Sequence, residues 1–388
     1  MASGRVALYC SSDQLGGLEK YTIQVLQWLN ERGNNISLIT SGNSPMSSYA
    51  TAKYVQLYDT PFINRFVSIR KARNLANVIK REQLEVLIIV RPRDITTAVL
   101  ARFFFRRRLV LIYYQLRYIT LHGNLRFYSL LFRPFRFWLV AMKFLATDMH
   151  SLRYPKSSRI RVVHPCVDTS YFSENRLSQA EARESLNLPT DRKILGVLGR
   201  LSEEQKHDFV IRAMQFLKIN GYPADLLIMG PAKDPEQEEY QEFLQLLVKE
   251  CNLEGHVHFR SYPANMPVFF GAIDAFVVNK SIRPYDTAII KALASGVPVV
   301  ARSSETNNYL LQEGQIGLLY KTNDLENFAA KMILILTQNK VVEHLRACGK
   351  AAALEKYDKD TICNLLEESL HTSMKVNARK KGIEQPDY

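Results

Sequence analysis

In three short segments of the sequence, residues that could bind or react with a substrate lie where a loop leads into a helix. The first is Ser12–Glu19, in which the adjacent glycines Gly16 and Gly17 join a strand pattern to a helical pattern. Backbone N–H groups at such a turn can approach an anion or a developing negative charge. A plain tight turn explains the same residues, so this segment alone leaves both interpretations open.

The second segment, Gly199–Lys206, also lies directly after a strand pattern and before a helical one. Its cations Arg200 and Lys206 suit a diphosphate, whose negative charge grows as a bond to it breaks. Cations are also common on surface loops, which is the alternative interpretation. The third segment is Ser281–Val300, in which a loop opens a short helix that Gly296 ends.

The elements that must position these segments alternate along the whole chain. Apolar runs of four to seven residues recur between helical patterns, and Gly33 ends the first helix as a left-handed cap would. We predict strands at Val6–Tyr9, Ile36–Thr40, Val86–Val90, Leu109–Tyr113, Ile194–Leu198, Asp225–Met229, Val257–Arg260, Ala275–Val278, Pro298–Ala301 and Gly317–Tyr320. We predict later helices at 208–220, 236–252, 287–295, 325–338 and 359–375, followed by a loose tail from Lys375.

This alternation predicts an α/β protein with two Rossmann-like, doubly wound domains that face a central cleft. We expect an N-terminal domain at 1–168, a C-terminal domain at 169–354, and a C-terminal helix within 355–388 that joins the first domain. Residues 1–170 hold 25 Lys and Arg against 9 Asp and Glu, whereas residues 171–388 hold 26 against 29. The cationic first half and the near-neutral second half therefore suit different partners.

The composition also indicates the class of protein and the cellular compartment to expect. Among 388 residues, 47% are hydrophobic and 23% charged, which excludes a disordered chain and a coiled coil. The five cysteines are scattered without a CxxC pair, which favours a reducing compartment over a disulfide framework or a structural zinc site. No signal-peptide pattern and no apolar run of membrane-spanning length are present, so we expect a cytoplasmic protein.

The stretch 95–147 has an unusual composition, because it contains no Asp or Glu. Between 101 and 145 lie eight Arg, one Lys and thirteen aromatic residues, including Phe103–Arg108 and Phe132–Trp138. Cations interleaved with aromatic rings suit the surface of an anionic bilayer. A structural role with solvated arginines and a groove for single-stranded nucleic acid are the two alternatives.

Two further patterns have simpler interpretations. Asp358-Lys359-Asp360 has the spacing of a metal–nucleotide motif, but it directly precedes an apolar helical pattern and is better explained as a helix N-terminus. His256 and His258 alternate along a predicted strand, and the neighbouring sequence offers them no acidic or thiol partner. We therefore expect no metal site.

The order of these segments resembles the retaining GT-B glycosyltransferases, in particular family 4, over most of the chain. Gly16–Glu19 looks like the family's N-terminal glycine turn, and Val163–Phe172 is similar to its interdomain segment, with Cys166 where glycine is usual. Gly199–Lys206 looks like its phosphate-binding Arg/Lys pair, one residue further apart than usual. Ala292–Val300 is close to the family's most recognisable stretch.

The resemblance implies a nucleotide-sugar donor in the C-terminal half, an acceptor in the N-terminal half, and transfer with retention, without metal or cofactor. The sequence also departs from the family. Arg283 and Lys291 stand where glutamates are usual, the loop 303–308 lacks the usual glycine pair, and Arg91–Asp94 stands where a histidine is often found. Because a cation cannot accept a hydrogen bond from a hydroxyl, contacts to the ribose and sugar would be lost there, whereas phosphate binding could become stronger.

Together these features predict a peripheral-membrane glycosyltransferase on the inner face of the cell membrane. It would build a cell-envelope polysaccharide or other cell-surface glycan on a lipid-linked acceptor, with no nucleic-acid partner. The expected catalytic residues are Gly16, Gly17, Arg200 and Lys206; the donor diphosphate would be held by Arg200, Lys206, Arg283 and Lys291; and the acceptor or bilayer would be faced by Arg91, Arg93, Arg106, Arg107 and Arg108. The alternative is a pseudo-glycosyltransferase that binds a glycan, anion or partner subunit without catalysis.

Overall fold

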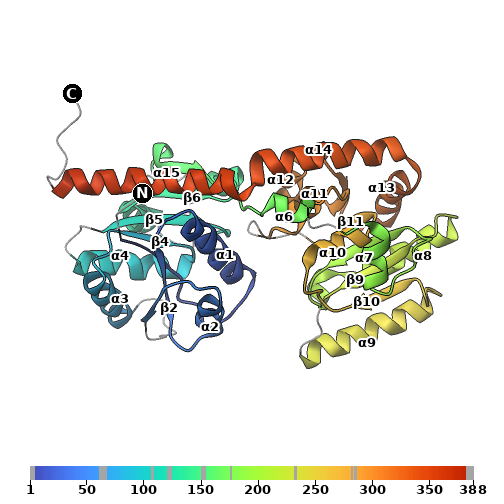
Figure 1. Ribbon diagram of the computed structural model, residues 1–388, viewed down its shortest axis with the longest axis horizontal. Coiled ribbons are helices and arrows are strands. Elements are labelled where there is room, and N and C mark those ends of the chain that lie inside the picture. Colours follow the sequence, from blue (N-terminus) through green and yellow to red (C-terminus); the bar gives the residue numbers. More distant parts are fainter. Residues whose placement is uncertain are drawn as a thin grey trace. The chain divides into compact units, whose positions relative to one another are not determined.

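The computed structural model describes residues 5–60, 68–105, 109–119, 125–149, 154–174, 177–230, 234–280, 283 and 286–381. They form two compact units (Figure 1). Unit 1 comprises residues 1–165, 284–286 and 359–388, and unit 2 comprises 166–283 and 287–358. Each unit is a parallel sheet with interleaved helices, which confirms the predicted α/β class and the Rossmann-like architecture.

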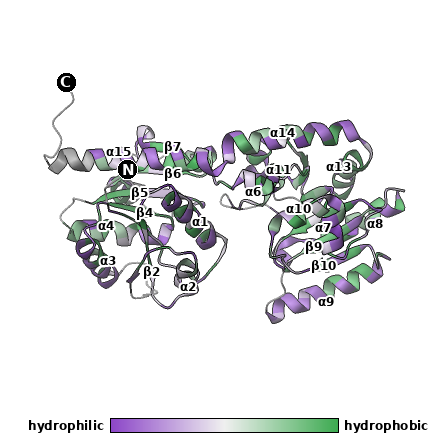
Figure 2. Ribbon diagram, viewed as in Figure 1, coloured by the Kyte–Doolittle hydropathy of each residue, from purple (hydrophilic) through white to green (hydrophobic). Residues whose placement is uncertain are grey.

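Unit 1 contains a seven-stranded sheet in the order β3-β2-β1-β4-β5-β6-β7. Its strands are β1 (Val6–Tyr9), β2 (Ile36–Ser41), β3 (Leu57–Thr60), β4 (Val86–Ile89), β5 (Val110–Gln115), β6 (Phe135–Val140) and β7 (Ile160–Val162). Its helices are α1 (Gly17–Glu31), α2 (Pro45–Ala52), α3 (Ile69–Arg81), α4 (Ile95–Phe104), α5 (Leu125–Phe132) and α15 (Lys359–Lys381). Figure 2 shows hydrophobic residues along β4 and β5 and a mainly hydrophilic α3.

Unit 2 contains a six-stranded sheet in the order β10-β9-β8-β11-β12-β13. Its strands are β8 (Ile194–Leu198), β9 (Asp225–Met229), β10 (Val257–Arg260), β11 (Ala275–Val278), β12 (Val299–Arg302) and β13 (Leu318–Tyr320). Its helices are α6 (Thr169–Glu174), α7 (Gln179–Ser185), α8 (His207–Ile219), α9 (Pro235–Glu250), α10 (Met266–Ala272), α11 (Ala288–Ala294), α12 (Glu305–Leu310), α13 (Leu325–Thr337) and α14 (Asn339–Tyr357).

In each sheet, the chain first adds strands on one side of the sheet's first strand and then adds the remaining strands on its other side. In unit 1 the chain builds β1 to β3 on one side and then crosses to β4 on the other side of β1; in unit 2 it crosses in the same way from β10 to β11, beside β8. Loops that leave neighbouring strands in opposite directions open a crevice at the carboxyl ends of those strands. The fold therefore directs attention to the loops after β1 and β4, and to those after β8 and β11.

The glycines at two helix ends behave as the sequence predicts. Gly33 follows α1 with φ +87°, and Gly296 follows α11 with φ +65°. Residues with a Cβ rarely adopt this left-handed conformation, so glycine allows the chain to turn sharply towards the next strand. Both helices consequently return the chain to the sheet within a few residues, at β2 and β12.

The aromatic residues from 132 to 138 belong to the core, and the predicted membrane surface does not include them. Phe132, Phe135 and Trp138 are at most 1% exposed. The Trp138 indole donates a hydrogen bond to Gln115 Oε1 over 2.7 Å. Phe132 ends α5, and the residues from Phe135 form β6, between β5 and β7. The composition concealed this strand because arginines alternate with the buried rings.

Two smaller predictions concern the C-terminal helix. The tail is helical beyond Lys375, because α15 continues to Lys381. Its start at Lys359 confirms the interpretation of the surrounding acidic residues as a helix N-terminus. Asp358 accepts hydrogen bonds from Thr169, and Asp360 pairs with Arg32 at 2.6 Å. Both carboxylates therefore have structural partners.

The prediction that His256 and His258 lack an acidic partner is wrong. Asp225, which is fully buried at the start of β9, contacts His256 Nδ1 at 2.9 Å and His258 Nε2 at 2.8 Å. The parallel pairing of β10 with β9 brings them together, although they are separated by more than 30 residues. Burial alone would raise the pKa of the Asp225 carboxyl, but the hydrogen bonds from His258 and His256 outweigh it and lower that pKa. Within the described ranges, no group of three or more His, Cys, Asp and Glu side chains is arranged to hold a metal ion.

Candidate functional site

In unit 2, Arg200 and Lys206 lie on the loop between β8 and α8, at the carboxyl end of the sheet. Both side chains are exposed. Lys206 adopts φ +55° and ψ +43°, a left-handed conformation that costs a non-glycine residue about 1–2 kcal/mol. It directly precedes α8, whose first N–H groups carry a partial positive charge. The loop therefore presents two cations beside the positive end of a helix.

A close approach of two backbones fixes the start of this loop. Gly230 follows β9, and a Cβ at this position would lie 1.7 Å from the Gly199 carbonyl oxygen. Only glycine leaves room for that carbonyl. The loop that carries Arg200 is thus packed directly on the neighbouring strand end.

Two buried asparagines that the sequence analysis missed hold the strand ends together. Asn279, directly after β11, donates from Nδ2 to the Lys206 carbonyl over 2.6 Å and accepts a hydrogen bond from the Tyr320 hydroxyl. Asn307 donates from Nδ2 to the carbonyls of Lys280 and Arg302, both over 2.8 Å. The left-handed conformation of Lys206 is therefore held by a side chain 73 residues away. Asn279 directly follows a predicted strand, which was the one available signal in the sequence, whereas Asn307 lies within α12 and had no such signal.

His207, the first residue of α8, lies in surroundings that disfavour a positive charge on its ring. Its side chain is fully buried, and neither ring nitrogen has a hydrogen-bond partner among the described residues. Burial, and then the positive charge of Lys280, lower the pKa of His207 to about 4. The imidazole is therefore neutral at pH 7, in surroundings where an added positive charge is unfavourable.

The structure places Arg283 and Lys291 differently from each other. Arg283 Nη2 lies 3.6 Å from Glu204 Oε1, beside the loop that carries Arg200 and Lys206. Lys291, on α11, has its Nζ 5.8 Å from the centre of the Phe172 ring, which belongs to α6. A cation over an aromatic face is attracted to it, so Lys291 has a packing contact within unit 2.

In unit 1, Gly16 and Gly17 lie at the exposed start of α1, after β1. Glu19 is buried; its Oε2 accepts from the Gly16 N–H over 3.0 Å and its Oε1 accepts from the Ser12 hydroxyl over 2.9 Å. This carboxylate caps the helix and fixes the turn, as in a capping box. The remaining N–H groups of the first turn are available to an anion.

A buried polar network joins the ends of β1 and β4 and was not foreseen from the sequence. Asp94, fully buried, accepts hydrogen bonds from the Ser11 N–H over 2.9 Å and from the Ser11 hydroxyl. Lys71 Nζ lies 2.8 Å from Ser11 Oγ and 3.4 Å from Asp94 Oδ1. Arg91 donates to the Ser11 carbonyl over 2.6 Å, whereas Arg93 is exposed. Arg91 thus helps to hold the loop after β1.

Arg106, Arg107 and Arg108 are not among the residues that the structure describes. Nearby, α4 and α5 contact each other and expose large apolar side chains. These are Phe103 (68% exposed), Phe104 (40%), Phe127 (58%) and Leu130 (65%). Arg73 lies 5.6 Å from the centre of the Phe104 ring. We call these five residues the aromatic–basic patch. None of the helices in the described ranges is long and apolar enough to cross a membrane.

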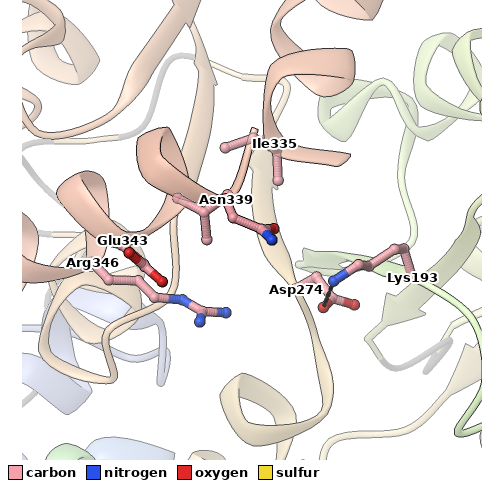
Figure 3. Close-up of a pocket in the computed structure, with 7 residues that line it drawn as sticks. Lys193, Asp274, Ile335, Asn339, Glu343 and Arg346 are labelled. Carbon is pink, nitrogen blue, oxygen red and sulfur yellow. Dashed lines mark hydrogen bonds and ion pairs between the residues drawn. The ribbon is translucent and has the colours of Figure 1, made fainter. Parts of the chain in front are cut away.

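A pocket in unit 2 lies at the amino ends of β8 and β11, whereas Arg200 and Lys206 lie at the carboxyl ends of the strands. Figure 3 shows the residues that line this pocket. Lys193 and Asp274, which directly precede β8 and β11, line it together with residues of α13 and α14. Its volume is about 90 Å³, whereas sites for drug-sized ligands measure roughly 300–1,000 Å³. Asp274 is already bound by Lys193 at 3.2 Å and by Arg183 at 2.8 Å. The pocket is therefore too small for a nucleotide sugar.

Two family models match most of the chain. "Glycosyltransferase Family 4" matches residues 15–171, and "Glycosyl transferases group 1" matches residues 178–354. Among curated proteins, the lipopolysaccharide core biosynthesis glycosyltransferase LpsE of Rhizobium meliloti is 26% identical over 180 residues, which is 46% of this chain and 50% of the relative. The D-inositol 3-phosphate glycosyltransferase of Thermomonospora curvata is 27% identical over 236 residues, 58% of this chain and 54% of the relative. The chain thus spans about half the length of these relatives.

Solved structures agree over almost the entire chain. A glycosyltransferase from Rickettsia africae superposes with a TM-score of 0.85 at 14% identity, covering 97% of this chain and 100% of the other. HepE from Anabaena, solved in complex with UDP, gives 0.81 at 17% identity, covering 95% and 100%. At these identities the likeness shows the fold. With both family models and this fold in agreement, the chain belongs to the GT-B glycosyltransferases of the family 4 type.

Proposed function

We propose that this glycosyltransferase moves a sugar from a nucleoside-diphosphate sugar to a lipid-linked or cell-surface glycan acceptor. In this proposal the transfer retains the anomeric configuration and needs no metal. The observation that carries the donor half of the proposal is the position of Arg200 and Lys206 at the point where the unit 2 sheet reverses. Loops of this kind are where open α/β sheets bind ligands. The UDP complex of HepE and the lipopolysaccharide relatives support the same substrate classes.

The proposed chemistry requires stabilisation of a leaving diphosphate. As the bond to the sugar breaks, negative charge grows on the phosphate oxygens, and prearranged cations stabilise that charge without reorganisation. Arg200 and Lys206 would supply the charges, and the first N–H groups of α8 would add their dipole. Asn279 keeps the Lys206 backbone in place, so binding of the phosphate need not order the backbone at this cation.

The test is release of UDP, GDP or ADP from the corresponding activated sugars with lipid-linked acceptors, with release of CMP from CMP-activated sugars as the comparison, followed by assignment of the product anomer by NMR. We expect Arg200→Ala/Lys206→Ala to abolish donor binding. Arg212→Ala/Lys218→Ala, two exposed cations further along α8, is the matched control and should bind normally. Unchanged donor affinity in the first double variant would remove the assignment, and an inverted product would contradict retention.

A pseudo-glycosyltransferase is the second candidate, and Arg283 and Lys291 favour it. A cation at either position cannot accept a hydrogen bond from a ribose or sugar hydroxyl. The double variant Arg283→Glu/Lys291→Glu separates the two candidates. A gain of turnover would indicate a disabled enzyme, whereas a loss would indicate an active site remodelled around the cations.

We further propose that unit 1 meets its acceptor at an anionic membrane surface on the cytoplasmic side through the aromatic–basic patch. Exposed rings can enter the headgroup boundary while Arg73 contacts an anionic headgroup, which contributes roughly 1 kcal/mol. Sedimentation with vesicles of phosphatidylglycerol and of phosphatidylcholine tests this. Phe103→Ser/Phe127→Ser should lose binding to the anionic vesicles, whereas Phe243→Ser/Leu246→Ser, two exposed positions on α9, should retain it. Equal binding by both variants would contradict the assignment.

A further inference from the structure

Unit 2 gathers more positive charge at its strand ends than a diphosphate needs. Besides Arg200 and Lys206, Lys280 follows β11 and Arg302 ends β12. The side-chain amide of Asn307 holds the carbonyls of Lys280 and Arg302 at 2.8 Å each, so these two residues lie side by side. Asn279, next to Lys280 in sequence, holds Lys206. Lys206, Lys280 and Arg302 therefore form one strand-end cation cluster.

The charges of this cluster act on buried groups of α8 and β13. The Lys280 charge acts on the ring of His207 at the start of α8. The Arg302 charge acts on the hydroxyl of Tyr320, which donates to Asn279. Arg302 Nε is itself buried and has no hydrogen-bond partner among the described residues. A buried donor without a partner is costly, so an acceptor that came within reach of this guanidinium would be bound favourably.

Arg283 adds a further cation beside the cluster. Its contact with Glu204 is 3.6 Å long, and the two side chains are 56% and 65% exposed. Exposed pairs of this kind contribute little and are easily exchanged for a better partner. Glu203 and Glu305 are also exposed. A carboxylate that entered the site could therefore replace Glu204 at Arg283.

We infer that the donor carries a third anionic group on the sugar that is transferred, so that the substrate class is a nucleotide-activated uronic acid. The inference rests on the proposed function. Arg200 and Lys206 would neutralise the diphosphate, and Arg302, Lys280 and Arg283 would meet the sugar carboxylate. A planar guanidinium matches the two oxygens of a carboxylate, which a neutral hexose lacks. An additional phosphate on the nucleotide would offer the same anionic chemistry, so the test must separate these sources.

The experiment is titration calorimetry on the full chain with matched ligands. The pairs are UDP-glucose with UDP-glucuronate, UDP-galactose with UDP-galacturonate, and GDP-mannose with GDP-mannuronate; ADP and its 3′-phosphate form the fourth pair. We expect at least one uronate to bind about 10-fold or more tightly than its neutral counterpart, as for a charge-assisted hydrogen bond made in place of none. Arg302→Gln should reduce that ratio towards one.

Controls separate charge from folding. Arg212→Gln makes the same charge change on the exposed face of α8 and should keep the ratio. Lys280→Ser is a second, half-exposed position in the cluster, should Arg302→Gln fail to fold. Uronates that bind no better than neutral sugars would overturn the inference, as would a gain with the 3′-phosphate alone. Binding of none of the nucleotides would instead overturn the proposed function.

Discussion

Asn279→Ala is the substitution that best tests how unit 2 positions its donor-binding lysine. Asn279 is 6% exposed and joins the Lys206 carbonyl, at 2.6 Å, to the Tyr320 hydroxyl. Alanine removes both hydrogen bonds and leaves two polar groups without their partner. A buried group left in this way costs about 1–3 kcal/mol, so we expect a loss of about 2–4 kcal/mol in the free energy of unfolding.

The same substitution should reduce donor use beyond what stability explains. Without Asn279, one of the hydrogen bonds that offset the about 1–2 kcal/mol of left-handed strain at Lys206 is lost, and the loop can relax. A loss of 1.4 kcal/mol of positioning corresponds to a tenfold change, so we expect kcat/KM for the donor to fall about 10-fold. The measurements are urea unfolding and steady-state kinetics at a temperature where the variant remains folded.

Two variants make the reasoning refutable. Asn220→Ala removes a bond of 2.8 Å to the Phe216 carbonyl at an exposed position, and should leave both the free energy of unfolding and the kinetics nearly unchanged. Tyr320→Phe removes one of the two bonds of Asn279, and its combination with Asn279→Ala should cost less than the sum of the single changes. Additive costs, or a donor kcat/KM equal to that of the Asn220 variant, would refute a positioning role for Asn279.

Three further changes have expected outcomes. Between pH 6.5 and 4 His207 becomes protonated in the unfolded chain but not in the folded chain. The wild type should therefore lose up to about 3 kcal/mol of unfolding free energy as the pH falls. The His207→Leu variant should lack this loss when urea unfolding is compared at pH 7 and pH 4.5. Lys71→Met leaves the buried Asp94 without its cation and should cost about 3–5 kcal/mol by thermal unfolding, with partial recovery in Lys71→Met/Asp94→Asn. Gly230→Ala drives a methyl group into the Gly199 carbonyl and should lower both stability and donor affinity, which calorimetry would detect.

Local patterns predict the strands of unit 2 well because of their physical setting. β8, β9, β10 and β11 begin and end at the predicted residues. Parallel strands covered on both faces are continuous apolar runs that turns or helix patterns bound, as in β8 and β11. The edge strand β10, which is only half-buried, is not such a run. β3, β6 and β7 were not foreseen, because their sequences do not form such runs. In β6, Arg136 interrupts the buried rings, so composition suggested a surface where the fold has a core strand.

The cationic part of the candidate site could be predicted for the same local reason. Arg200 and Lys206 lie on one short loop, so their spacing in the sequence is also their neighbourhood in space. Asp94, Lys71 and Asn279 act through partners at least 23 residues away. Which strand ends become neighbours depends on the order of strands in the sheet, and no local pattern specifies that order.

The same distinction bears on what makes Arg200 and Lys206 more than surface cations. Exposed cations on a mobile loop would lose conformational entropy on meeting a phosphate, which would reduce the net gain. Here the start of the loop packs closely on Gly230, and Asn279 binds the end of the loop at the Lys206 carbonyl. The short motif thus provides charge, and distant buried residues provide position. If that division is correct, substitutions at Gly230 and Asn279 should weaken donor binding although neither residue carries a charge.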